Sequence, residues 1–176
     1  NVIHMVNKFE AAGIAGVIIE DKLFPKQNSL LLNGRQELAS VAEFVGKIMA
    51  AKNAQKTKDF MVIARIEALI AGWGQDEAIK RANAYFEAGA DAILIHSKKN
   101  TPDEVIEFVN RWDKAAPIVI VPTNYPSFTE DEIKKYSKIK MVIYANHVIR
   151  SVVTSVKETL NEIYSAKGVQ TVSPKL

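Results

Sequence analysis

Short apolar runs alternate with longer amphipathic stretches along the whole chain. Residues 2–12 carry Ile3, Val6 and Phe9 at helical spacing, and Gly13 follows where a C-terminal cap would lie. The apolar segment 14–19, "IAGVII", comes next and is predicted to be a short buried strand. The pattern therefore opens with a helix and then a buried strand.

The same order repeats to the end of the sequence. Further strands are predicted at 60–68, 91–97, 117–123 and 140–146, with helices at 38–51, 76–90, 101–112, 130–136 and about 148–166. Continuous apolar strands separated by amphipathic helices indicate an α/β fold with a parallel sheet. We expect both faces of that sheet to be covered.

Three helix starts carry specific signals. Thr101 with Glu104, and Thr129 with Glu132, have the spacing of a capping box. Asn146 stands where it can cap the last helix. These signals predict where the helices begin.

Composition narrows the class of protein. The chain has 176 residues, 48% of them hydrophobic and 24% charged, which suits one globular domain over 1–176. No apolar run approaches the ~20 residues that span a bilayer, so we expect no membrane contact and a cytoplasmic location. The net charge of +3 is dispersed, and no basic stripe points to nucleic acid.

Cysteine and the common nucleotide motifs are absent from the sequence. Without cysteine, any metal must use oxygen or histidine ligands. The sequence also lacks the phosphate-binding G-x-x-x-x-G-K-[ST] loop, the G-x-G-x-x-G turn, the G-x-S-x-G elbow and the H-E-x-x-H helix. Candidate chemistry must come from elsewhere.

A long polar segment, 20–36, follows the first strand. It opens with "EDKLFPKQNS" and has two carboxylates, two lysines, an amide and a hydroxyl in ten residues. Segments this long in compact α/β domains are disproportionately functional or mobile. The segment is either a solvated turn or one wall of a reaction site.

Polar residues also follow each predicted strand. A weak internal repeat, "AAGIAGVIIED" and "EAGADAILIHS", aligns Glu20 with His96 at equivalent points. Active sites of parallel sheets and barrels lie at this carboxyl edge. The candidates are Glu20 with Asp21, Arg65 with Glu67, His96 with Ser97, Thr123, and Asn146 with His147.

Arg65 allows two interpretations. Alternation places it on one side of its strand with Glu67, and an arginine there is costly unless it meets an anion. It either closes the sheet edge in an ion pair with Glu67 or Glu20, or offers a guanidinium fork to a carboxylate or phosphate.

The histidines and carboxylates leave similar choices open. His96 is either a core histidine bonded to a backbone carbonyl or a proton-transferring group, whereas His4 is expected on the surface or in packing. Glu20 and Asp21 are either solvated or suited to Mg²⁺, a hard cation that keeps several waters.

Six stretches together resemble a known family. "EDKLFPKQNS", "GRQELA", "ARIEALIAGWGQDEA", "AGADAILIHSKK", "VIVPT" and "VIYANH" are similar to the phosphoenolpyruvate mutase and phosphonopyruvate hydrolase branch of the isocitrate lyase superfamily. The resemblance covers nearly the whole chain, in order and at matching spacing. It is closest to the mutase.

The resemblance implies a fold and an assembly. Members are TIM (β/α)₈ barrels, and full barrels take ~250 residues. This chain would be a C-terminal portion with strands four to eight, a gating loop at about 22–37 and a C-terminal helix at about 148–166. That helix would be exchanged with a neighbouring subunit in a homo-oligomeric dimer of dimers.

It also implies roles for individual residues. Glu20 would reach Mg²⁺ through water, while the family's principal metal-binding aspartates have no counterpart in this chain. Lys26, Asn28 and Ser29 would belong to the gating loop. Arg65 and His96 would contact the phosphoryl group and the pyruvyl part of the substrate.

The implied activity is the interconversion of phosphoenolpyruvate and phosphonopyruvate. The hydrolase, which releases pyruvate and phosphate, has Thr where this chain has Asn28, so that residue favours the mutase. A hydrolase and a non-catalytic fragment or pseudoenzyme are the alternatives.

Overall fold

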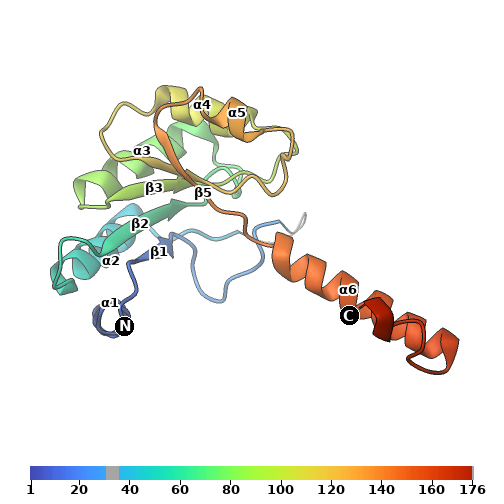
Figure 1. The fold of residues 1–176 in the computed structure, drawn as a ribbon. Helices are drawn as coiled ribbons and strands as arrows, with labels where there is room; N and C mark the ends of the chain where they lie inside the picture. The colour runs from blue at the N-terminus through green and yellow to red at the C-terminus, as the bar shows by residue number, and fades with distance from the viewer. Residues whose placement is uncertain (31–35, 176) are drawn as a thin grey trace. The chain divides into compact units, whose positions relative to one another are not determined.

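The computed structural model describes residues 1–30 and 36–175 and divides into two units, 1–143 and 144–176. Helices and strands alternate through the first unit (Figure 1). Its elements are α1 (Val2–Ala11), β1 (Gly16–Glu20), α2 (Val41–Ala54), β2 (Met61–Ile66), α3 (Gly74–Glu87), β3 (Ala92–Ile95), α4 (Asp103–Arg111), β4 (Ile118–Ile120), α5 (Glu130–Ile133) and β5 (Ile139–Val142). Every predicted helix and strand of this unit is present.

The five strands form one parallel sheet in the order β1-β2-β3-β4-β5. Each strand lies beside its neighbour in sequence, so crossovers of one hand bring the helices to the same face. In Figure 1 these helices lie around the outside of the curved sheet. This sequential order is typical of barrel strands, whereas in doubly wound sheets the order of the strands reverses at a switch point.

The helix-covered face holds the larger apolar core. Alternate strand residues such as Val62, Ala64 and Ile66 pack there with Phe44 and Tyr85 from the helices. The opposite face carries a smaller buried cluster. We expected both faces of the sheet to be covered, but the described helices pack on one face, because the strands follow in sequence order with crossovers of one hand.

One of the two predicted capping boxes is present. Thr129 Oγ1 accepts a hydrogen bond from the backbone N–H of Glu132, and Glu132 Oε2 accepts one from the backbone N–H of Thr129 at 2.9 Å. The box at Thr101 and Glu104 is wrong, because Glu104 Oε2 instead accepts a hydrogen bond from Ser97 Oγ at 2.5 Å.

The second unit is built on α6 (His147–Ala166), followed by a short 3-10 turn, Ser173–Lys175. No residue of α6 is buried. Asn146 is the residue before the helix, as predicted, but its side chain makes no capping hydrogen bond. Among the residues that the structure describes, no helix has the length and apolarity to cross a membrane.

Candidate active site

Three neighbouring strands bring their polar ends together on one face of the sheet. The register pairs Glu20 with Arg65, and Arg65 with Leu94. Because side chains alternate, Glu67 and His96 follow two residues later on the same face. The predicted meeting of strand-end residues is therefore observed for β1, β2 and β3.

Arg65 makes both of the predicted ion pairs. Its Nε lies 2.7 Å from Glu67 Oε1 and 3.3 Å from Glu20 Oε2. Its side chain remains 24% exposed. The guanidinium therefore closes the sheet edge and still faces the open side, where it can meet a further anion.

A buried carboxylate organises the surrounding charges. Glu67 is fully buried and accepts a hydrogen bond from Ser29 Oγ at 2.5 Å, while Lys22 Nζ lies 3.2 Å from it. Ser29 Oγ in turn accepts from Lys22 Nζ at 2.7 Å and from Arg65 Nη2 at 3.2 Å. We call Lys22, Ser29, Arg65 and Glu67 the Glu67 cluster.

The pKa of Glu67 shows whether burial or the surrounding cations and hydrogen bonds have the larger effect on its carboxyl group. Burial opposes ionisation of the carboxyl group. The charge of Arg65 and the hydrogen bonds from Ser29 and Arg65 outweigh it and lower the pKa of Glu67 below its ordinary value. The carboxylate is therefore ionised at neutral pH and needs its cations.

Sequence reasoning missed Lys22. It stands in a polar segment and would ordinarily be a surface lysine, yet it is only 5% exposed. One signal was available: Lys22 follows Glu20 by two residues, so strand alternation puts both on the same face. Its Nζ also donates to the backbone carbonyl of Gln27 at 3.0 Å, which holds the polar segment toward the sheet.

Lys26 and Glu20 form the outer ion pair of the site. Lys26 Nζ lies 2.8 Å from Glu20 Oε1, with side chains 52% and 15% exposed respectively. Glu20 thus carries a cation on each oxygen, because Arg65 approaches the other one. Such a carboxylate is accessible from the open face.

Asn28 lies at the surface in a local turn. Its Oδ1 accepts a hydrogen bond from the backbone N–H of Leu30 at 2.9 Å, and its carbonyl oxygen accepts one from Gln36 Nε2 at 3.3 Å. The predicted gating loop spans about 22–37, and its residues 31–35 lie outside the described residues. Asn28 therefore stays a candidate site residue because of its position: it precedes Ser29, which belongs to the Glu67 cluster.

His96 is a buried, neutral imidazole. It is 5% exposed, and burial together with the charge of Arg65 lowers its pKa to about 4. Within the described part of the chain its Nδ1 has no hydrogen-bond partner. The alternative of a core histidine held through Nδ1 by a backbone carbonyl is therefore not observed. Buried polar atoms are normally satisfied, so a polar ligand or water at this nitrogen would complete it.

Asp21 does not join Glu20 at the open edge. It is fully buried, and its carboxylate accepts hydrogen bonds from the backbone N–H of Glu67, from Arg81 Nη1 and from Tyr85 OH at 2.8–2.9 Å. Burial nevertheless raises its pKa. Interpreting Glu20 and Asp21 as paired metal ligands is wrong for this structure.

The described residues contain no group of three His, Cys, Asp or Glu side chains that could hold a metal. Glu20 is partly exposed, is a hard oxygen donor and stands at the strand end. As a single carboxylate, Glu20 suits a contact with Mg²⁺ through water, and it does not by itself supply a complete set of metal ligands.

The other polar candidates lie elsewhere. Ser97 is buried and bonded to Glu104, and Thr123 Oγ1 is a buried atom without a partner in the described structure. His4 is exposed, as predicted, and His147 is exposed in the first turn of α6.

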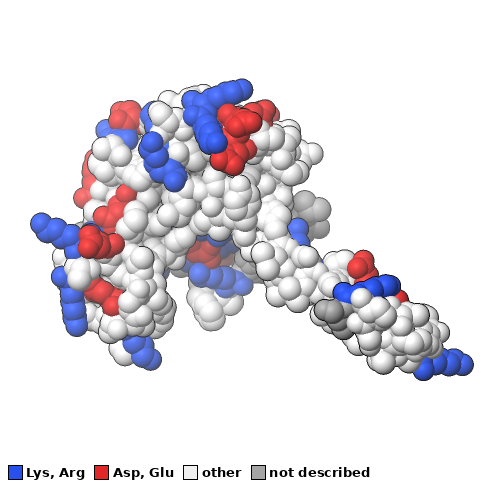
Figure 2. Space-filling view, in the orientation of Figure 1, with Lys and Arg blue, Asp and Glu red and all other residues white. Residues whose placement is uncertain are grey.

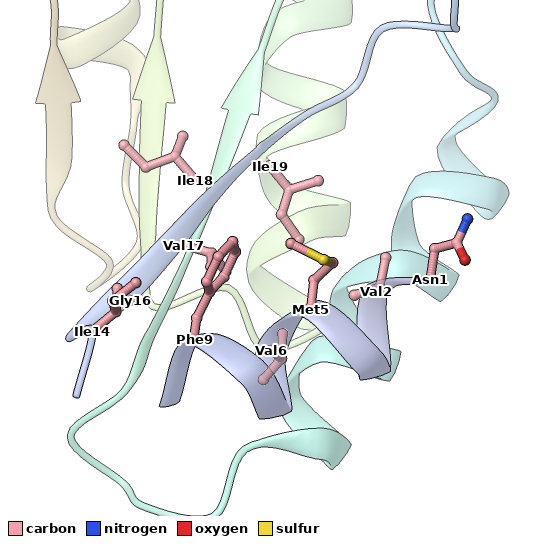
Figure 3. Close-up of a pocket in the computed structure, with 10 residues that line it drawn as sticks. All are labelled: Asn1, Val2, Met5, Val6, Phe9, Ile14, Gly16, Val17, Ile18 and Ile19. Carbon is pink, nitrogen blue, oxygen red and sulfur yellow. The ribbon is translucent and has the colours of Figure 1, made fainter. Parts of the chain in front are cut away.

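An apolar groove of about 470 Å³ lies between α1 and β1 (Figure 3). Met5 and Phe9 of α1 face Val17 and Ile19 of β1 across it. Its lining has no Asp, Glu, His, Lys or Arg. The groove therefore offers no acid-base or anion-binding chemistry, unlike the carboxyl edge of the sheet.

Sequential parallel strands with charged residues gathered at their carboxyl ends are the arrangement of (β/α)-barrel enzymes. The family model described as phosphoenolpyruvate phosphomutase matches residues 1–164. The chain belongs to that family.

Two curated relatives match along the entire chain. A phosphonopyruvate hydrolase from Variovorax sp. (strain Pal2) is 52% identical over 176 residues, which are 100% of this chain and 61% of the relative. A phosphoenolpyruvate phosphomutase from Tetrahymena pyriformis is 51% identical over 176 residues, 100% of this chain and 58% of the relative. The chain thus spans about three fifths of their length.

Solved structures agree with the fold. The phosphoenolpyruvate phosphomutase from Streptomyces platensis subsp. rosaceus matches with a TM-score of 0.94 and 51% identity, covering 99% of this chain and 60% of that one. A phosphonopyruvate hydrolase in complex with oxalate and Mg²⁺ matches with a TM-score of 0.91 and 48% identity, covering 99% and 59%. The predicted barrel-type fold is confirmed, and the match is to part of a longer barrel.

Proposed function

We propose that the protein carrying this chain interconverts phosphoenolpyruvate and phosphonopyruvate with Mg²⁺. One observation carries the proposal: Ser29 of the polar segment is hydrogen-bonded to Glu67 and Arg65 at the strand ends. The segment with Lys26 and Asn28 is therefore anchored beside the guanidinium that suits a phosphoryl group.

The reaction moves one phosphoryl group within one substrate. The P–C bond of phosphonopyruvate breaks, and a P–O bond forms at the enolate oxygen of the same molecule. Little covalent chemistry is left for the protein, so positioning and electrostatic stabilisation supply most of the catalysis. Arg65 would hold the charge of the transferring group, and the neutral imidazole of His96 would bind it beside Arg65.

The polar segment would guide the group and exclude water. Lys26 neutralises Glu20 in this structure and would lend positive charge at the open face. Asn28 would guide the phosphoryl group between carbon and oxygen. Water must be kept away, because a phosphoryl group captured by water becomes phosphate.

Magnesium would supply a Lewis acid that stabilises the enolate when bound. The similar hydrolase structure contains Mg²⁺, and Glu20 is the described carboxylate that fits a role in the cation's water shell. The remaining ligands would come from the part of the barrel that this chain does not include.

Assembly is a further part of the proposal. α6 presents an exposed apolar stripe at helical spacing, formed by Val148, Ile149, Val152, Val153, Val156, Leu160 and Tyr164. A large unpartnered apolar face of this kind marks an interaction surface. We propose that a second copy covers it, within the predicted dimer of dimers. A cytoplasmic location stays a prediction.

The surface charge and the apolar groove between α1 and β1 also bear on the proposed partners. On the face shown in Figure 2, basic and acidic side chains are interspersed, and this face has no basic stripe of the kind that binds nucleic acid. The groove beside β1 would take the preceding part of the barrel, because β1 is the edge strand of the described sheet.

Phosphorus NMR tests the proposed function. Intact protein with Mg²⁺ and phosphonopyruvate is expected to give the resonance of phosphoenolpyruvate. Phosphate and pyruvate without phosphoenolpyruvate would establish the hydrolase, which the 52% identical relative keeps as the second candidate. If phosphonopyruvate persists unchanged, the chain belongs to a non-catalytic protein or pseudoenzyme.

Replacing Asn28 with alanine is expected to lower kcat by about a hundredfold, because a guiding contact made in the transition state is lost. Stability should change by less than about 0.5 kcal/mol, because Asn28 is exposed. Steady-state kinetics and urea unfolding measure the two effects. The exposed Gln27→Ala serves as the control, and an unchanged kcat in Asn28→Ala would remove the role of Asn28.

A further inference from the structure

Arg81 of α3 is buried on the helix side of the sheet, away from the Glu67 cluster. It is 2% exposed, and its Nη1 donates to Asp21 Oδ2 at 2.9 Å and to the carbonyl oxygen of Ala39 at 3.1 Å. Its Nε donates to Glu77 Oε1 at 2.9 Å, and its guanidinium lies 5.0 Å from the centre of the Trp73 ring. The guanidinium therefore bonds at once to Asp21 after β1, to Ala39 before α2 and to Glu77 of its own helix.

The contacts of Arg81 join the two ends of the polar segment. Asp21 precedes the segment and Ala39 follows it, and the backbone N–H of Ala39 donates to the carbonyl oxygen of Asp21 at 2.8 Å. Next to them Lys22 and Leu38 form an antiparallel bridge. The two ends of the segment are therefore paired with each other, and Arg81 bonds to both ends. We call the paired residues Asp21, Lys22, Leu38 and Ala39 the base of the segment.

The same base is connected to the reacting face. Asp21 Oδ1 accepts a hydrogen bond from the backbone N–H of Glu67 at 2.9 Å, and Asp21 Oδ2 accepts one from Tyr85 OH at 2.8 Å. Glu67 then holds Ser29 on the opposite face of the sheet. Asp21 thus links the base of the segment to Glu67, and Glu67 binds Ser29 near the middle of the segment.

Burial of this pair is not explained by stability. Replacing buried ion pairs with well-packed apolar residues is often neutral or stabilising. Arg81 Nη1 instead joins the Asp21 carboxylate to the Ala39 carbonyl, which fixes how the two ends of the segment lie beside each other.

We propose that Arg81 is a positioning residue that fixes the base of the 22–37 segment, so that Lys26, Asn28 and Ser29 are held over the strand ends. Arg81 touches no reacting group and acts through Asp21 and Ala39. The inference rests on the proposed function for its effect on turnover. Its effect on the segment is independent of that function.

Arg81→Lys is the main test, because lysine keeps the charge but cannot donate to Asp21, Ala39 and Glu77 in the arginine geometry. In the intact protein we expect trypsin to cut within 22–37 about tenfold faster, and kcat to fall about tenfold while KM changes less than about threefold. Arg111→Lys is the matched control, because Arg111 is half-exposed and pairs with Asp76 on the surface.

Tyr85→Phe and Tyr125→Phe form a second matched pair. Both tyrosines are fully buried, but Tyr85 OH is bonded to Asp21 and Arg81, whereas in the described structure no hydrogen bond joins Tyr125 OH to either of these residues. We expect segment cleavage to rise about threefold in Tyr85→Phe and to stay unchanged in Tyr125→Phe. This pair keeps the test valid if Arg81→Lys fails to fold.

The outcomes separate two failures. Cleavage that rises only in proportion to global unfolding, or equally in the controls, overturns the role of Arg81. Faster cleavage with unchanged kcat overturns its effect on turnover. If the wild-type protein turns over no phosphonopyruvate, the proposed function fails, and the cleavage rates still decide whether Arg81 holds the segment.

Discussion

Replacing Arg65 with alanine is expected to lower kcat/KM for phosphonopyruvate by about a thousandfold, because under the proposed function a preorganised cation beside the transferring phosphoryl group is lost. The protein should stay folded, since Lys22 and Ser29 still contact Glu67. Steady-state kinetics with Mg²⁺ in excess measures the loss, and circular dichroism verifies the fold.

Two variants make the Arg65 result specific. Arg65→Lys keeps the charge without the fork and should recover at most about tenfold of the lost activity. Arg111→Ala removes a half-exposed arginine of α4 and should leave kcat/KM within about twofold. If Arg65→Ala stays within about tenfold of the wild type, Arg65 does not stabilise the transferring group.

The order of elements was predictable because it depends on local periodicity. The strand expected at 60–68 is observed at Met61–Ile66, and the helix expected at 148–166 begins at His147. Predicted strands were too long, since the polar residues at their ends continue the alternation but lie beyond the ladder. The side of the sheet taken by the helices depends on crossover hand, which no single segment encodes.

Part of the site was predictable for the same reason. Glu20, Arg65 and His96 end apolar strands, and parallel strands bring such ends to one edge. Alternation places Lys22 on the same face as Glu20, but the burial of Lys22 and Arg81 could not be predicted, because it depends on Glu67 and Asp21, distant in sequence. Ion pairs between distant segments leave no periodic signal.

The choice between mutase and hydrolase lies in a different kind of information. Relatives of both activities are 52% and 51% identical to the chain, so overall similarity does not separate them. The fold and the Arg65 to Glu67 pair suit either reaction, since both break the same P–C bond. Under the proposed function the difference is whether water reaches the phosphoryl group, and we propose that Asn28 and the segment around it decide this.

Replacing Glu67 with alanine is expected to destabilise the protein by about 3–5 kcal/mol, the largest stability effect anticipated for this site. The reason is the lysine left behind: the Lys22 side chain is 3% exposed and would lose the carboxylate 3.2 Å from its Nζ. Ser29 would also lose the acceptor of its hydroxyl. Urea unfolding at pH 7, with the slope compared between variants, measures the change.

A double variant shows whether the cost comes from the unpaired charge. Lys22→Met combined with Glu67→Leu removes both charges and keeps apolar volume, and it should recover at least about half of the lost stability. Exposed Glu107→Ala, whose partner Arg111 is at the surface, should cost less than about 0.5 kcal/mol. A double variant as unstable as Glu67→Ala would mean that Glu67 stabilises the strand ends through its hydrogen bonds rather than by balancing Lys22.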